Sequence, residues 1–359
     1  MKLASLTLAL LLSASTTFAS EMCTNSLAMI CKDAKAENAK QETYLKELSY
    51  KIREDAAPRI EARTEAALKK IAKFRLIKRA LTEMRIQQQE IMRTAQRMYP
   101  EINALLADKS KHEELKSYVR EAIGVTDFAK DAKLNMHKIL NEVQIVSFEE
   151  YIDIFDIDES LFKNMTMNGC GTDGLAVNAF AFKHPTKKTK FVVICPGLAL
   201  KSQALTNKED AYEDITFVIA HELGHHIDNG EVGNQVYANY LSCIARDHAQ
   251  ELVMTKKTEK VCKKSSQEEC RVANTLTHAR ELVSDVWGFK ALNVYRARHN
   301  YNILNTEDLI KSNLQFLCNS SDEGTHASGD FRVGIHLQMN QDVKEALSCQ
   351  DSQVKTCSF

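Results

Sequence analysis

Apolar residues recur with helical spacing through the first half of the chain. Residues from about 33 to 145 are rich in Ala, Glu, Lys, Arg and Leu, with only Pro58 and Pro100 as expected breakers. In part of this region, apolar residues are spaced alternately three and four positions apart, which is a heptad pattern. The positions of this heptad seam are Phe74, Ile77, Leu81, Met84, Ile91, Ala95 and Met98, and the polar Gln88 occupies the position between Met84 and Ile91. This predicts a long amphipathic helix in a hairpin or bundle, or alternatively a coiled-coil arm for a partner.

The pattern changes after residue 145. Residues 175–182 and 190–197 have the composition of strands, and a polar turn at 184–190 joins them, which predicts a β-hairpin. Helical periodicity resumes near Asp210 and continues to the end, with a charged interruption at 255–272. The predicted fold is therefore mainly α, of the α+β type, with a small hairpin or sheet. We expect a helical region over 20–145 and a second domain over 146–359.

The N-terminal residues have the features of a secretory signal. Lys2 precedes an apolar run from Leu3 to Leu12, and small residues at Thr17 and Ala19 suit cleavage after Ala19. The run is too short to span a membrane, and no later segment is apolar enough. We therefore expect residues 1–19 to be removed and the mature protein to be soluble and exported, either periplasmic or secreted. A formal net charge of −1 argues against nucleic acid as a partner.

Ten cysteines, an even number, predict up to five disulfides in an oxidising compartment. Three pairs share one sequence spacing, and the remaining four cysteines form one local and one long-range pair. The expected bridges are Cys23–Cys31, Cys262–Cys270, Cys349–Cys357, Cys170–Cys195 and Cys243–Cys318. Zinc held by cysteines is the weaker alternative, because no two cysteines have CxxC spacing.

The segment HELGH at 221–225 carries the main chemical signal. His221 and His225 are four residues apart, so a helix places both rings on one face, where they can reach one metal ion. Glu222 lies beside that face and can take a proton from water activated by Zn²⁺. His226 is rotated about 100° from His225 and is expected to be a surface residue rather than a ligand. The alternative to a metal site is that these residues form a polar patch on the surface of an ordinary helix.

A third ligand is needed, and two candidate carboxylates lie downstream. A metzincin would have Gly at 228 and His at 231, but the chain has Asp228 and Glu231. Glu281 and Asp285 are four residues apart on a predicted buried helix. Glu281 can complete a two-His, one-Glu zinc site, and Asp285 can orient a ligand histidine. The alternative is a solvated acidic face. The remaining histidines are expected to have structural roles. His278 is the exception to examine, because it lies one turn before Glu281.

HELGH with ExxxD at 281–285 resembles the M48 family of gluzincin metallopeptidases. The segment NAFA, comprising Asn178, Ala179, Phe180 and Ala181, is similar to the family's edge-strand motif. The segment THASGDFR at 325–332 is similar to its C-terminal motif, with Ala327 in place of the usual proline. The resemblance covers about 165–340 and implies a gluzincin core within residues 146–359.

The resemblance also implies roles for individual residues. His221, His225 and Glu281 would bind one Zn²⁺, Glu222 would be the general base, and Asp285 would support the ligands. His326 would be a catalytic residue near the metal, where it would stabilise the oxyanion or occupy the open position in a resting form, and Arg332 would support that region. The strand at 178–181 would pair with an extended polypeptide substrate.

The sequence thus predicts an exported zinc metalloendopeptidase, with envelope protein quality control as a role by analogy. The alternative is a scaffold or chaperone-like protein with a structural or latent zinc site, whose helical region binds partners. That region could also be a regulatory segment that covers the cleft.

Overall fold

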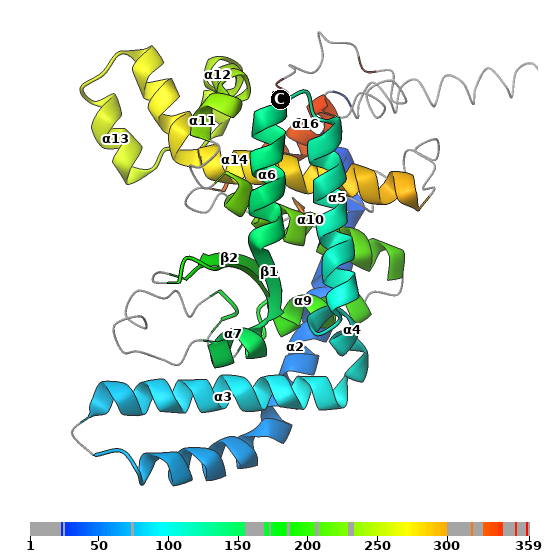
Figure 1. Ribbon diagram of the computed structural model, residues 1–359, viewed down its shortest axis with the longest axis vertical. Coiled ribbons are helices and arrows are strands. Elements are labelled where there is room, and N and C mark those ends of the chain that lie inside the picture. The colour runs from blue at the N-terminus through cyan, green and yellow to red at the C-terminus, as the bar shows by residue number, and fades with distance from the viewer. Residues whose placement is uncertain are drawn as a thin grey trace, which may run out of the picture. The chain divides into compact units, whose positions relative to one another are not determined.

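A computed structural model describes the structure of most of the chain (Figure 1). The described residues are 23, 26–72, 75–154, 169–171, 174–184, 187–204, 208–228, 233–299, 317–318, 326–339, 349 and 357. The chain divides into two compact units. Unit 1 comprises Met1–Asn38, Glu121–Met136 and Ile227–Phe359, and unit 2 comprises Ala39–Arg120 and His137–His226. The expected signal segment at 1–19 lies outside the described residues.

Unit 2 contains the helical hairpin that the heptad seam favours. Helix α2 (Ser26–Leu68) is followed by α3 (Leu76–Met98), and the two lie side by side in Figure 1. Their side chains pair in antiparallel order: Arg59 donates to Thr94 at 2.7 Å, and Arg63 pairs with the buried Glu90. Along the seam Leu81, Gln88, Ile91 and Ala95 are buried, whereas Met98 is exposed. Phe74 lies outside the described residues.

One of the two expected proline breakers does not break its helix. Pro58 lies inside α2, which continues to Leu68 and bends in Figure 1. Proline removes one backbone hydrogen bond and kinks a helix, and packing of α2 on α3 can offset that cost. Pro100 does end a helix, because α3 stops at Met98 and Pro100 starts the 3₁₀ turn η1 (Pro100–Ile102).

Three further helices complete this part of the chain. A short helix α4 (Asn103–Leu106) precedes α5 (Lys109–Val125) and α6 (Lys130–Glu142). His112 on α5 is buried, and its Nε2 lies 2.7 Å from the Leu105 carbonyl of α4. Burial lowers the pKa of His112 below its ordinary value of 6.5.

A three-stranded sheet lies in unit 2, in the order β1-β3-β2. The predicted hairpin is confirmed as β2 (Ala179–Lys183) and β3 (Lys190–Ile194), which pair antiparallel. The sequence reading missed β1 (Val143–Ser147), which pairs parallel with β3 and runs across the boundary expected at 145. The five residues of β1 follow α6 directly, so their short apolar run resembles the continuation of a helix.

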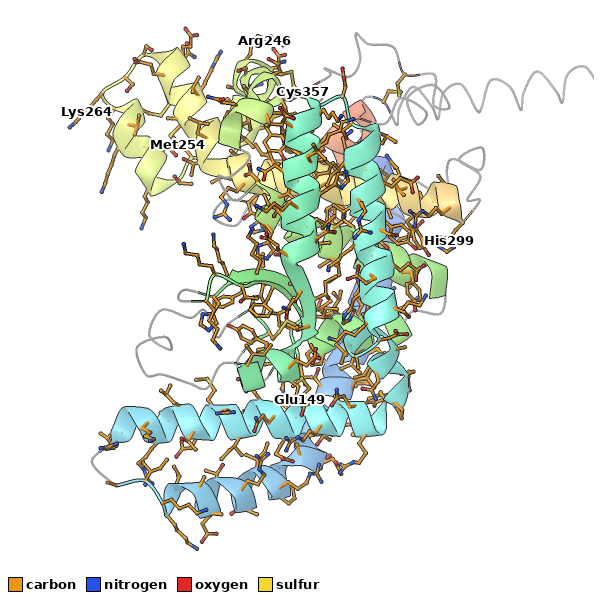
Figure 2. All side chains as sticks on the ribbon, in the orientation of Figure 1. Glu149, Arg246, Met254, Lys264, His299 and Cys357 are labelled. Carbon is orange, nitrogen blue, oxygen red and sulfur yellow. A yellow bond between two sulfur atoms is a disulfide. The ribbon has the colours of Figure 1, made fainter. Side chains whose placement is uncertain are left out.

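One face of this sheet is covered by a cluster of buried apolar side chains. Phe148 and Tyr151 of α7 (Phe148–Ile154) pack there with Phe191 and Val193 of β3. The expected Cys170–Cys195 disulfide lies in the same cluster. Glu149 of α7, labelled in Figure 2, pairs with Arg93 of α3 at 3.2 Å.

Two helices follow the sheet. Helix α9 (Pro196–Ala204) begins directly after β3, and α10 (Lys208–Ile227) carries the HELGH segment. The start of α10 fits the expected resumption of helix near Asp210. Ile215, Phe217 and Ile219 are buried, so the apolar residues before HELGH lie in a core as their composition predicts.

Unit 1 is organised around the long helix α14 (Gln267–Arg298). It starts at a capping box in which Ser266 and Glu269 exchange hydrogen bonds. Buried residues run from Leu282 to Phe289. The other helices described after Ile227 are α11 (Gly233–Val236), α12 (Ala238–Asp247), η2 (Ala249–Glu251), α13 (Lys256–Cys262) and α16 (Gly329–Met339). Helices α12, α13 and α16 all contact α14. The charged interruption at 255–272 is thus largely helical.

The five disulfides confirm two of the expected pairs and contradict three. Cys170–Cys195 and Cys262–Cys270 form as expected. The other pairs are Cys23–Cys349, Cys31–Cys318 and Cys243–Cys357, with Cys357 labelled in Figure 2. Cys31 lies inside a helix, where a residue eight positions away would be about 12 Å distant, too far for a disulfide. Equal sequence spacing was therefore misleading.

The mainly helical fold with a small sheet agrees with the sequence prediction. None of the helices in the described part of the chain has the length and apolar character needed to cross a membrane.

Candidate metal centre and catalytic residues

Helix α10 presents the two histidines of HELGH on one side. The rings of His221 and His225 lie edge to face, with centroids 4.8 Å apart. His221 is buried and His225 is half-buried. A spacing of four residues is close to one helical turn, which is why both rings reach the same place.

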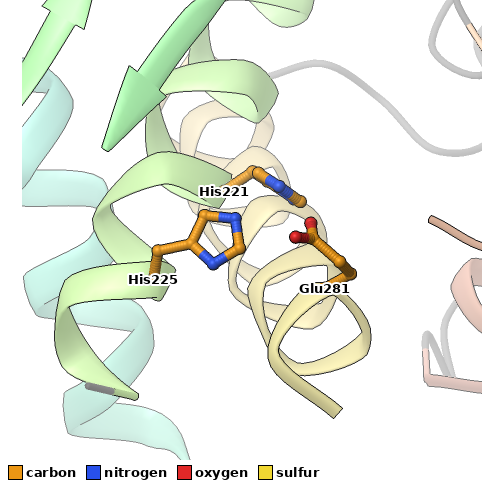
Figure 3. A group of neighbouring side chains, drawn as sticks. All are labelled: His221, His225 and Glu281. Carbon is orange, nitrogen blue, oxygen red and sulfur yellow. The ribbon is translucent and has the colours of Figure 1, made fainter. Parts of the chain in front are cut away.

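Glu281 of α14 supplies a carboxylate to the same group. One ligand atom from each of His221, His225 and Glu281 lies within 4.8 Å of the others, and Figure 3 shows the three side chains facing one another. Two imidazole nitrogens and one carboxylate oxygen are donors that Zn²⁺ prefers, and ligands about 2.1 Å from one ion have separations of this order. The donor set therefore fits zinc.

His326 and Arg332 pair with Glu281 and Asp285 of α14, respectively. His326 is half-exposed, and its Nε2 lies 3.0 Å from Glu281 Oε2. Arg332 of α16 donates through Nε and Nη2 to both oxygens of Asp285, at 2.8 and 2.7 Å. The side chain of Asp285 is only 2% exposed and that of Arg332 is 12% exposed. This bidentate pair joins α16 to α14 next to Glu281.

The environment of Asp285 also affects a neighbouring tyrosine. Tyr240 of α12 is fully buried, and burial, followed by the charge of Asp285, raises the pKa of Tyr240 well above 10.0. Tyr240 therefore remains a neutral phenol beside the ion pair at neutral pH.

Glu222 lies against the edge of the sheet. Its Oε2 accepts a hydrogen bond from the Ala181 N–H of β2 at 2.7 Å, and the Glu222 side chain is 12% exposed. Helix α10 and strand β2 thus hold this carboxylate from two sides. Because β2 has β3 as its only neighbouring strand among the described residues, its other edge carries no strand there.

The register shows which backbone groups of β2 face that edge. Asn178 accepts from the Cys195 N–H, and the His184 N–H donates to Thr189, so even-numbered residues face β3. In an antiparallel pair the backbone groups of alternate residues point outward. Of the residues expected to bind substrate, Ala179 and Ala181 therefore face the edge, whereas Asn178 and Phe180 pair with β3.

The sequence reading missed Lys183, the third residue of β2 that faces outward. Ala179 is buried, Ala181 is half-buried and Lys183 is exposed, so the accessible part of the edge is its C-terminal half. Two-residue alternation counted from Ala181 would have identified Lys183.

Two histidines near the motifs have structural partners. His226 is buried rather than on the surface, and its Nε2 lies 2.8 Å from the Phe191 carbonyl of β3. His278 is also buried, and its Nε2 lies 2.8 Å from the Val253 carbonyl. A second cluster of donors, Cys243, Asp247 and Cys357, contains a disulfide, so its cysteines are not free to bind a metal.

A histidine pair, a nearby carboxylate and a glutamate at a sheet edge are the side chains expected of a metal-dependent hydrolase. Residues 159–318 match the family model described as peptidase family M48, whose members are zinc-dependent peptidases. The match includes β2, α10 and Glu281, but neither the α2–α3 hairpin nor His326 and Arg332. None of the curated proteins matches the chain.

Proposed function

We propose that this protein is an exported zinc-dependent metalloendopeptidase. The observation that carries the proposal is the position of Glu222, which is hydrogen-bonded to an edge strand and lies between two histidines of the same helix. A glutamate in this position can meet both a water molecule and a peptide that pairs with β2. A scaffold with a structural metal would have no use for such a residue.

His221, His225 and Glu281 would hold the metal. When bound, zinc supplies a Lewis acid that polarises the scissile carbonyl and lowers the pKa of water. Glu222 accepts the proton of the attacking water and returns it to the leaving amine. Because the Ala181 N–H is donated to Glu222, the Ala181 carbonyl and the backbone groups of Lys183 orient the substrate as an additional strand.

The residues around Glu281 would position it. Arg332 neutralises Asp285, so the buried Asp285 carboxylate on α14 does not compete with Glu281 for the metal.

His326 would have a different role. It is half-exposed and 3.0 Å from Glu281, and it would stabilise the negative charge that develops on the carbonyl oxygen of the substrate.

Two further features support export and the proposed kind of substrate. Five disulfides suit an oxidising compartment outside the cytosol. Pairing through the backbone tolerates many sequences but requires an extended chain. Unfolded polypeptides are therefore the substrate class we propose, consistent with a role in protein quality control.

Zinc removal and restoration test the proposal. The purified protein should contain one zinc per chain, lose cleavage of an unfolded polypeptide on chelation, and regain it with zinc. Glu281→Ala and His225→Ala should weaken zinc binding at least tenfold, whereas His299→Ala, a change of an exposed histidine on the same unit as Glu281, should not. Full zinc content in Glu281→Ala would contradict the ligand assignment, and cleavage by metal-free protein would contradict the mechanism.

A further inference from the structure

The turn of the β2–β3 hairpin is strongly basic, although the whole chain has a net charge of −1. Residues 183–190 contain four lysines and no acidic residue. Lys190 is buried and pairs with Glu142 at 3.2 Å. Lys183, Lys187 and Lys188 are exposed and make no ion pair with any residue that the structure describes. Within the described part of the chain, no carboxylate therefore neutralises these three positive charges.

Two hydrogen bonds to His184 link the described residues of the turn. The Lys188 N–H donates to the His184 carbonyl at 3.0 Å, and the Lys187 N–H donates to the His184 ring at 3.2 Å. Burial lowers the pKa of His184, and the charge of Lys187 lowers it further, so the imidazole adds no positive charge at neutral pH. The positive field of the turn comes from the lysines alone.

Lys183 is the lysine closest to the proposed chemistry. It lies two residues beyond Ala181, whose N–H holds Glu222, and two residues of strand cover about 7 Å. Its side chain is on the same face of the sheet as that of Ala181, because side chains alternate along a strand. Phe180 and Phe182 take the opposite face and pack edge to face against Tyr151.

A peptide added at this edge would place one side chain beside Lys183. Directly opposed residues of paired strands have Cβ atoms about 5 Å apart, and opposite charges at such positions attract. The accessible edge consists of Ala181 and Lys183, so a substrate paired along it lies against Lys183. Lys187 and Lys188 in the adjoining turn add to the positive potential there.

We propose that Lys183 is a specificity residue, supported by Lys187 and Lys188, which favours polypeptides with an acidic side chain opposite it. The preferred acidic residue lies two positions from the substrate residue that faces Ala181, on one side of the scissile bond only. This inference rests on the proposed peptidase function and names a charge preference for it.

A set of matched peptides tests the preference. The peptides share one cleavable sequence and carry Glu, Gln or Lys at each position around the scissile bond in turn. Wild-type kcat/KM should favour Glu over Lys by up to about fivefold at one position, the range of exposed ion pairs. Lys183→Glu should reverse the order at that position, and 1 M salt should reduce the preference. Lys260→Gln, a change of an exposed lysine on α13, should leave the preference intact.

The outcomes separate the two claims. Cleavage of all the peptides by wild type with equal kcat/KM would overturn the charge preference and leave the peptidase function standing. A preference for Glu that persists in Lys183→Glu would overturn the role of Lys183. Failure of zinc-loaded wild type to cleave any peptide of the set would contradict the peptidase function, and with it this inference.

Discussion

Arg332→Met should destabilise the protein strongly, because it leaves the buried carboxylate of Asp285 without its cation. The Asp285 side chain is 2% exposed and accepts two hydrogen bonds from Arg332, at 2.8 and 2.7 Å. Removing one partner of a buried ion pair typically costs about 3–5 kcal/mol. At roughly 2–4 °C per kcal/mol, the melting temperature should fall by roughly 6–20 °C.

The control is a similar pair that remains in solvent. Arg298 donates to Glu121 at 2.6 and 3.0 Å, and the two side chains are 40% and 45% exposed. Arg298→Met should cost less than about 1 kcal/mol. Urea unfolding, followed by circular dichroism, measures both variants. Adding Asp285→Leu to Arg332→Met should recover part of the loss, because the unpaired charge is removed. An Arg332→Met loss no larger than that of Arg298→Met would refute this reasoning.

Three further predictions concern packing, pH and connectivity. Gly197→Ala should cost about 1–3 kcal/mol in urea unfolding, because its Cβ would lie 2.1 Å from the Leu175 carbonyl, whereas Gly334→Ala has open space and should cost little. The free energy of unfolding should decrease as pH falls below about 6.5, because the pKa of His112 is lowered in the folded state and the unfolded chain takes up the proton more readily. His112→Gln should flatten this dependence between pH 7.5 and 5, and an unchanged slope would contradict the assignment to His112. Mass mapping of a non-reduced digest should give the pairs Cys23–Cys349, Cys31–Cys318 and Cys243–Cys357, and a Cys23–Cys31 peptide would contradict them.

Local periodicity predicted the elements that carry the candidate site. The four-residue spacing of His221 and His225 requires only that residues near HELGH form a helix, which the apolar positions before it favour. The hairpin of β2 and β3 was predictable because two short apolar runs flank a polar turn. In both cases the information lies within about ten residues of sequence.

Features that depend on distant contacts were missed or wrong. The three long-range disulfides join residues 114 or more positions apart, and no spacing rule specifies such proximity. Strand β1 was missed because its pairing with β3, rather than its own pattern, defines it. His226 was placed on the surface by its angle on α10, but packing of that helix buries it against β3.

The most direct test of the central claim is peptide cleavage by zinc-loaded Glu222→Gln. The substitution keeps the size of the side chain but removes the carboxylate that accepts the Ala181 N–H and the proton of water. We expect this variant to bind one zinc per chain, as wild type does, and its kcat with an unfolded polypeptide to fall at least a hundredfold. Cleavage at the wild-type rate by this variant would contradict the assignment of Glu222 as the general base.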